Sequence, residues 1–312
     1  MVSPGLLSTV QDGGRQGYRH HGLAQGGAMD LRSYAWANKL LDNPRNAACL
    51  EMVLGGFHAI ARGNLQIALT GAEAPVRVNG RPMPLWQTLN LTDGDELVIG
   101  RSSSHRLIYL AVAGGLDAPE CFGSCSVVVR EHMPGQDPVA SGDRLVALKD
   151  GHQQPIRSVP QQHRLAPDTE TRLRLIPGYQ YREFHPNDML RLTTSTYRVS
   201  DLSDRMGFRL NGLAMGSSPP GIISEGIANG ALQIPGDGLP IVLLNDCQTI
   251  GGYAKPGVVP ALDCGLLAQQ LPGARVRFEL ADLATVQNER RLFERHYQCT
   301  RWRSCGQSLE WQ

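Results

Sequence analysis

Short apolar or alternating runs, separated by frequent turn residues, restrict what this chain can fold into more than any other feature. The clearest runs are 65–70, 76–78, 96–99, 106–112, 171–176, 241–244 and 275–280. Each has the length of a β-strand, and Asn79-Gly80 after the second run is typical of a type I′ hairpin turn. Many short strands with closely spaced turns favour a barrel or a sandwich, so the sequence predicts a mainly β fold.

Helical spacing occurs in three segments. Asp30 is placed to cap a helix whose apolar side chains follow in 31–41. Asp263 is placed to cap a shorter helix, and an amphipathic pattern covers 283–297. The sequence therefore predicts a few short helices.

Length and composition indicate two folded domains. A chain of 312 residues is longer than a domain with one hydrophobic core usually is, and its hydrophobic content of 41% is typical of folded proteins. Apolar periodicity disappears in 150–167, where Gly, Gln, His and Pro dominate. We therefore predict an N-terminal domain at 1–160 and a C-terminal domain with a helical tail at 161–312.

Several classes of function lack support in the sequence. A net charge of +1 gives no electrostatic reason to expect nucleic acid or an anionic membrane as partner. No apolar run approaches the roughly 20 residues that span a bilayer, and no signal peptide is visible, so we expect a cytoplasmic protein. Seven scattered cysteines without a Cys-x-x-Cys spacing suggest neither a disulfide framework nor a metal site. Phosphate-loop, dinucleotide-binding, nucleophile-elbow and His-Glu-x-x-His motifs are also absent from the sequence.

Two glycine-rich loops, 9–18 and 245–257, carry the polar side chains best suited to a site. Glycine lets the backbone bend sharply, and polar groups on such loops beside an apolar scaffold commonly form binding and catalytic sites. Ordinary surface turns have the same composition, so that interpretation stays open. The polar residues concerned are Gln11, Asp12 and Arg15 in the first loop and Gln248, Thr249 and Lys255 in the second.

Further charged residues fit either a site or the scaffold. Asp204 and Arg205 form either an ion pair at a domain rim or a contact with substrate, and Glu225 lies in a third polar turn. Asp12 and Arg15 could likewise pair with each other. Glu51 lies in the apolar run 48–54, so its burial would require a partner.

Four ordered motifs resemble the carboxyltransferase A–B family. They are 10–18, 27–30, 203–210 and 248–255, and the resemblance extends over residues 4–280. The family includes the C subunit of bacterial 5-oxoprolinase, the KipA protein, proteins labelled allophanate hydrolase subunit 2 and part of urea carboxylase. Cys247 and Ala254 depart from the family pattern, which often has arginine and proline there.

This resemblance implies a fold, partners and a reaction. The fold would be two cyclophilin-like β-barrels. The partners would be a KipI-like B subunit together with a third, A-type subunit, with which such a chain opens 5-oxoproline to glutamate using ATP as co-substrate. The alternatives are a KipA-like regulatory protein that antagonises a kinase inhibitor, and a carboxyltransferase subunit of a biotin-dependent urea or amide carboxylase. No Met-Lys-Met biotin-attachment motif occurs in this chain.

The reactions of the family share a carbonyl carbon that is deactivated by nitrogen resonance. A fixed cation near the oxygen and a carboxylate near the N–H would both favour reaction. We predict Lys255 as this cation and Asp263 as the proton acceptor, brought together if the loop doubles back. A solvent-exposed lysine and a simple helix cap are the alternatives. The remaining predicted substrate-binding residues are Gln248, Thr249, Gln11, Asp12, Arg15, Asp204, Arg205 and Glu225.

Overall fold

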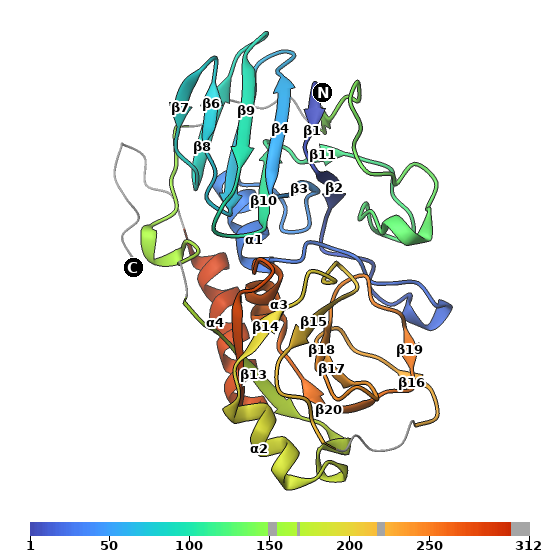
Figure 1. Ribbon diagram of the computed structural model, residues 1–312. Coiled ribbons are helices and arrows are strands. Elements are labelled where there is room, and N and C mark those ends of the chain that lie inside the picture. Colours follow the sequence, from blue (N-terminus) through green and yellow to red (C-terminus); the bar gives the residue numbers. More distant parts are fainter. Residues whose placement is uncertain (149–154, 167–168, 217–221, 301–312) are drawn as a thin grey trace. The chain divides into compact units, whose positions relative to one another are not determined.

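The computed structural model describes residues 1–148, 155–166, 169–216 and 222–300, and the chain divides into two compact units (Figure 1). Unit 1 contains Met1–Arg15, Gly26–Ala166 and Glu294–Gln312, and unit 2 contains Gln16–Gln25 and Pro167–Phe293. The predicted boundary after residue 160 lies shortly before the main division. It did not anticipate the two exchanged segments, Gln16–Gln25 and Glu294–Gln312.

Unit 1 is built on two five-stranded antiparallel sheets with the strand orders β1-β4-β9-β6-β7 and β2-β3-β10-β5-β8. One hydrophobic cluster draws side chains from both sheets, including Phe57, Leu69 and Leu110, so the core lies between them. A short ribbon joins β11 to β12. The strands are β1 (Ser3–Pro4), β2 (Leu7–Gln11), β3 (Cys49–Val53), β4 (Gly55–Ile60), β5 (Leu65–Gly71), β6 (Val76–Val78), β7 (Arg81–Met83), β8 (Gln87–Leu91), β9 (Glu96–Arg101), β10 (Leu107–Val112), β11 (Leu116–Asp117) and β12 (Val146–Ala147).

Local predictions for unit 1 agree with the structure. Asn79 and Gly80 have φ angles of 49° and 76°, the left-handed conformation that the type I′ turn between β6 and β7 requires. Helix α1 (Leu31–Leu40) is capped by Asp30, which accepts hydrogen bonds from the backbone N–H groups of its first turn. Glu51 is buried, and the Tyr109 hydroxyl donates to its carboxylate at 2.6 Å. Two short 3-10 helices complete the unit, η2 (Val129–Glu131) and η3 (Gln161–His163).

Unit 2 is a closed seven-stranded barrel in which each strand is antiparallel to its neighbours, except that β13 and β21 are parallel. The strands in barrel order are β13 (Thr171–Pro177), β20 (Ala254–Val258), β17 (Ala231–Ile234), β18 (Ile241–Leu243), β15 (Gly207–Asn211), β14 (Tyr197–Val199) and β21 (Arg275–Leu280). A two-stranded ribbon, β16 (Glu225–Gly226) with β19 (Ile250–Gly251), accompanies the barrel.

The helices of unit 2 include one that the sequence analysis missed. Helix α2 (Pro186–Thr194) has proline at its first position and a cap from His185, whose Nδ1 accepts the N–H of Asn187 at 3.2 Å. Helix α3 (Ala261–Ala268) begins after Pro260, so the prediction that Asp263 caps it is wrong. The other helical segments are η1 (Arg19–His21), η4 (Tyr179–Glu183) and the first part of α4 (Leu283–Cys299), whose last part belongs to unit 1.

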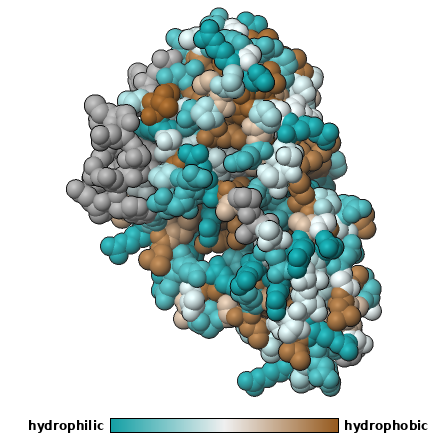
Figure 2. Space-filling model, turned by 60° about the vertical axis from the view of Figure 1, so that its left-hand side comes forward, coloured by the Kyte–Doolittle hydropathy of each residue, from teal (hydrophilic) through white to brown (hydrophobic). Residues whose placement is uncertain are grey.

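The predicted fold class, mainly β with a few short helices, is confirmed, and unit 2 is a closed seven-stranded β-barrel. The described residues contain four α-helices, and none of these is long and apolar enough to cross a bilayer. On the face drawn in Figure 2, hydrophobic side chains are scattered among hydrophilic ones.

Candidate functional site

Asp12, in the N-terminal glycine-rich loop, is held by an internal network of unit 1. Its carboxylate accepts hydrogen bonds from the Gly14 and Cys125 N–H groups, each at 2.8 Å, and from the Ser124 hydroxyl at 2.6 Å. The Ser126 hydroxyl is a further donor. The acceptor atoms of Asp12 are therefore used to tie 12–14 to 124–126.

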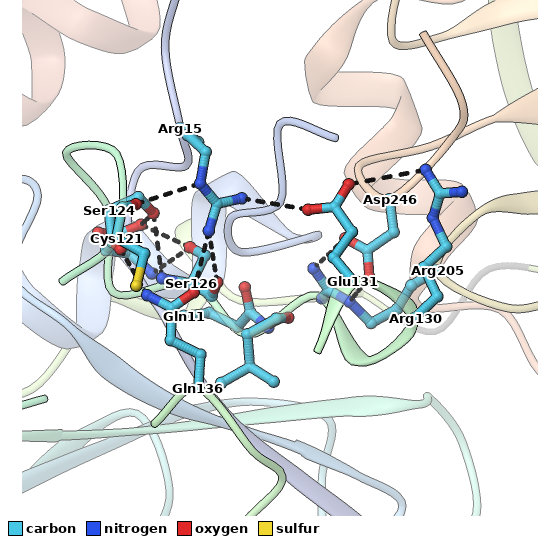
Figure 3. A network of polar contacts seen from close by, with 12 residues as sticks. Gln11, Arg15, Cys121, Ser124, Ser126, Arg130, Glu131, Gln136, Arg205 and Asp246 are labelled. Atoms are coloured by element: carbon cyan, nitrogen blue, oxygen red, sulfur yellow. Dashed lines mark hydrogen bonds and ion pairs between the residues drawn. The ribbon is translucent and has the colours of Figure 1, made fainter. Parts of the chain in front are cut away.

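Arg15 is even more deeply enclosed, with 1% of its surface exposed. Its guanidinium donates to the Cys121 and Ser126 carbonyls and, at 3.0 Å, to the Gln136 side chain (Figure 3). Glu131 supplies an opposite charge at 3.8 Å. A buried guanidinium with this many acceptors is typical of a structural anchor.

Gln11 is the third predicted substrate-binding residue of this loop. It is fully buried, and its Nε2 donates to the Thr9 hydroxyl at 3.0 Å and to the Val127 carbonyl at 2.8 Å. The structure thus gives all three predicted substrate-binding residues of the first loop internal partners, and apart from Gly14 the partners named for Asp12 and Arg15 come from 121–136.

Lys255 in the second loop has different surroundings. It lies on β20 with 9% of its surface exposed, and its Nζ is 2.6 Å from Glu225 Oε1. Nζ also donates to the Tyr253 carbonyl at 3.3 Å, and the Lys255 N–H donates to Gln180 Oε1 at 3.0 Å. An ammonium group and a carboxylate from different strands therefore meet in unit 2.

Tyr179, on η4, is the third member of this cluster. Hydrogen bonds from Lys255 and from the Tyr179 hydroxyl hold the pKa of Glu225 below its usual value, so Glu225 is ionised at neutral pH. The same bond to Glu225 raises the pKa of Tyr179 to about 12. Because Tyr179 is 69% exposed, the cluster opens to solvent on this side.

Asp263 does not pair with Lys255, which corrects our expectation. It is 1% exposed in the first turn of α3, and its carboxylate accepts two side-chain hydrogen bonds from Arg174, at 2.9 and 2.5 Å, and one from the Arg174 N–H at 2.8 Å. This interaction raises the pKa of Arg174, which also contacts Glu289. The expected pairing with Lys255 fails because Asp263 is bound to Arg174, in the middle of β13, instead.

Asp204 and Arg205 do not form the pair that we considered either. Asp204 accepts the N–H groups of Met206 and Gly207 and so closes a local turn. Arg205 forms two hydrogen bonds with Asp246, at 2.8 and 2.9 Å. Both residues shape the loops at the edge of the barrel.

Gln248 and Thr249 lie between Asp246 and the ribbon strand β19. The Thr249 carbonyl accepts the Ile227 N–H at 2.9 Å, and the Gln248 carbonyl accepts from Arg19 Nη2 at 3.1 Å. Both side chains are partly exposed, so the loop that we predicted to orient an amide substrate does border solvent.

Sequence reasoning missed Tyr179, Gln180 and Arg19. The first two precede the barrel strand β20 by some 75 residues in the chain, and only the closed barrel brings η4 to Lys255. Arg19 follows the motif 10–18 directly, and that adjacency was a usable signal. It lies in the segment Gln16–Gln25, which belongs to unit 2.

The cluster of Lys255, Glu225 and Tyr179 offers a hydrogen-bond donor beside an ionised acceptor. Such a pair can bind a group that carries a carbonyl oxygen next to an N–H and can move charge and a proton between them. Within residues 1–148, 155–166, 169–216 and 222–300, no group of three or more histidine, cysteine, aspartate or glutamate side chains is arranged to hold a metal ion.

Known proteins resemble this chain over most of its length. A carboxyltransferase domain model, subdomain A and B, matches residues 21–280. The C subunit of the 5-oxoprolinase of Escherichia coli (strain K12) is 33% identical over 309 residues, which cover 97% of each chain. The urea amidolyase of Lachancea kluyveri is 27% identical over 306 residues, but these cover 89% of this chain and only 16% of that protein.

A solved structure has the same fold. The crystal structure of the Kluyveromyces lactis urea carboxylase superimposes with a TM-score of 0.88 at 21% identity and covers 95% of this chain. This chain spans 28% of that larger protein. The match extends over both units of the present chain.

Proposed function

The chain belongs to the carboxyltransferase domain family with subdomains A and B, and from this premise we propose that it is a subunit of an ATP-dependent 5-oxoprolinase-type amidohydrolase. It would open 5-oxoproline to glutamate together with a KipI-like B subunit plus a third, A-type subunit. The full-length similarity to the C subunit of a 5-oxoprolinase supports this choice, because the similarity to urea amidolyase covers a small part of a much larger protein.

The ion pair of Lys255 and Glu225 is the observation that carries the proposal. A lactam is a cis amide, so its carbonyl oxygen and its N–H lie on the same side and meet one donor and one acceptor together. Lys255 would donate to the carbonyl oxygen as negative charge develops there, and Glu225 would accept the hydrogen of the N–H. Donors placed opposite such an oxyanion typically contribute about 3–4 kcal/mol.

ATP is proposed to bind elsewhere, on a partner protein or at a shared surface. A triphosphate needs several cations or free backbone N–H groups. Among the described residues, Lys255 faces Glu225, and Arg205 at the edge of the same barrel faces Asp246, so each of these two cations already has a carboxylate partner. These residues therefore fit a small amide much better than a nucleotide.

Carboxyl transfer to urea or an amide is the second candidate, favoured by the similarity to urea amidolyase. Urea also presents a carbonyl oxygen beside N–H groups, and the same ion pair would suit it. Biotin would then be carried by a separate partner, since this sequence has no Met-Lys-Met motif.

Reconstitution separates the candidates. The full chain is combined with a KipI-like protein and the third protein of the proposed complex, and glutamate release from 5-oxoproline is measured with and without ATP. We expect ATP-dependent release that requires all three chains. Absence of turnover in the complete mixture contradicts the leading proposal, and carboxylation that depends on a biotinylated carrier favours the second. Complex formation without either activity would favour a KipA-like regulatory role.

A further inference from the structure

Arg19 is a cation whose partners in the described chain are all uncharged. Its Nη2 donates to the Ile227 carbonyl at 2.8 Å and to the Gln248 carbonyl at 3.1 Å, and contacts Cys247 Sγ at 3.7 Å. Its Nη1 is buried and has no hydrogen-bond partner among the described residues. Arg19 is partly buried, and a guanidinium with an enclosed, unsatisfied nitrogen favours an anion as its partner.

Gln233 supplies a second donor without a partner. It lies on barrel strand β17 with 2% of its surface exposed, and its Nε2 makes no hydrogen bond within the described residues. More than 90% of buried polar groups in proteins are satisfied, so an exception inside a barrel points to a ligand contact. Asn229 Oδ1 is also without a partner, but it is an acceptor, and its amide nitrogen is bound to Asn245.

Arg19 and Gln233 are linked through Gly251. A Cβ atom at Gly251 would lie 3.2 Å from Gln233 Nε2, 3.7 Å from Gln248 Nε2 and 2.6 Å from the Ile227 side chain. Ile227 and Gln248 are also the residues that hold Arg19. Only a glycine fits at 251 without displacing Ile227 or crowding Gln233, so the backbone here lies directly against this group of donors, which we call the Gly251 cradle (Arg19, Gln233, Gln248 and Gly251).

The Gly251 cradle adjoins the ion pair described above. Gly251 is the direct cross-strand partner of Glu225 in the β16–β19 ribbon, and Glu225 holds Lys255. Residues opposite each other in an antiparallel pair have Cα atoms about 4.5–5.5 Å apart. One small molecule can thus reach both places.

We propose that the Gly251 cradle binds the carboxylate of the substrate, with Arg19 Nη1 and Gln233 Nε2 as its donors. The inference rests on the proposed function in that the lactam of the same molecule lies at Lys255 and Glu225. It makes the chain specific for a carboxylate-bearing lactam and disfavours urea, which has no group for the cradle. Arg19 and Gln233 are then specificity residues of this protein.

The test is calorimetric titration of the full chain, alone and with its two proposed partners, using 5-oxoproline and 2-pyrrolidinone. The second probe keeps the lactam and lacks the carboxylate. We expect Arg19→Gln and Gln233→Leu each to weaken 5-oxoproline binding by roughly tenfold or more, as loss of a hydrogen bond to a charged group does, and to leave 2-pyrrolidinone binding within about twofold.

Two glycines of one ribbon provide a matched control. Gly251→Ala places a methyl group 2.6 Å from the Ile227 side chain and 3.2 Å from Gln233 Nε2, so it should displace the donors and weaken 5-oxoproline binding, whereas Gly226→Ala on the facing strand meets no atom within 4 Å and should leave binding unchanged. Gln233→Leu removes an unsatisfied donor, so its Tm should equal or exceed that of the unaltered chain. A large fall in that Tm would show a scaffolding role and overturn the proposal.

The outcomes for the cradle and for the proposed function can be told apart. Equal affinity for the two probes, absence of 5-oxoproline binding in every mixture, or normal binding by both donor variants overturns the cradle. If Arg19→Gln and Gln233→Leu leave glutamate release unchanged, the cradle is overturned while the proposed function stands. Carboxylate-dependent binding without any turnover keeps the cradle and removes the proposed function.

Discussion

The two glycine-rich polar loops have similar compositions but different surroundings. In unit 1, Asp12 and Arg15 are enclosed by donors and acceptors from 121–136. In unit 2, the loop that leads to Lys255 borders an exposed tyrosine and an arginine with an unsatisfied donor. Glycine and charge thus mark two different things, a loop that binds its own scaffold and a loop that borders solvent and, in our proposal, a ligand.

This difference predicts where each kind of substitution acts. A residue whose hydrogen bonds are all internal should affect the free energy of unfolding when it is replaced. A residue of the second loop should affect turnover or ligand affinity at nearly constant stability, because functional sites often keep groups that do not stabilise the fold. The following four predictions test the contrast.

Arg15→Ala should have the largest effect, a loss of about 3–5 kcal/mol in the free energy of unfolding, because it leaves buried acceptors and Glu131 without their cation. Denaturant unfolding of the purified chain measures it. Arg62→Ala, an exposed arginine of the same unit, is the control and should change stability by less than about 0.5 kcal/mol. A stable Arg15→Ala chain with reduced ligand affinity would restore Arg15 as a substrate contact.

Lys255→Ala should lower turnover of the reconstituted complex by roughly 10²–10³-fold, since it removes the donor to the developing oxyanion. Complex formation and Tm should change little. The chain has only three lysines, and Lys39→Ala is a matched control outside the barrel, expected to keep full activity. Near-normal turnover of Lys255→Ala would remove this residue from the mechanism.

Asp263→Asn should cost about 1–3 kcal/mol in stability, because the buried acceptor of Arg174 loses its charge. Turnover per folded molecule should stay unchanged. Glu289→Gln alters the exposed partner of the same arginine and should cost less than about 1 kcal/mol. If Asp263→Asn instead lost turnover at constant stability, the catalytic role that we predicted from the sequence would be supported.

Tyr179→Phe should have the smallest effect, a change in pH dependence. The pKa of Glu225 is lowered first by Lys255 and then by Tyr179, so the ionised carboxylate persists until the pH falls through that lowered value. Without the phenol the pKa rises, and the acid limb of the kcat/KM profile should move to higher pH while its upper plateau changes little. Tyr253→Phe, an exposed tyrosine nearby, is the control and should leave the limb in place. An unchanged limb in Tyr179→Phe would contradict the cluster.

Local features were predictable from the sequence because their causes are local. The hairpin at Asn79-Gly80 follows from backbone preferences, and the cap of α1 follows from the side chain of Asp30. The sequence predicted that a buried Glu51 needs a partner. It could not identify Tyr109 as a partner, because that contact depends on the pairing of β3 with β10.

The candidate site was predictable only in part because its pairs join distant segments. The sequence identified Lys255 as the catalytic cation and Glu225 as a separate substrate contact. Their pairing was missed because nothing local indicates that β16 and β20 bring the two side chains together. Asp263 was assigned to the nearest cation in the chain, whereas the fold supplies Arg174 from 89 positions away. Gln233 carries no signal at all, because a glutamine in an apolar strand becomes informative only when its neighbours are known.

The chain passes between its two units at four points, after residues 15, 25, 166 and 293. No single break therefore releases two complete halves. A truncation that keeps only 161–312 would discard Arg19, and a fragment that ends at residue 160 would lose the last turns of α4. Point substitution is therefore better suited than truncation to dissecting the two units of this protein.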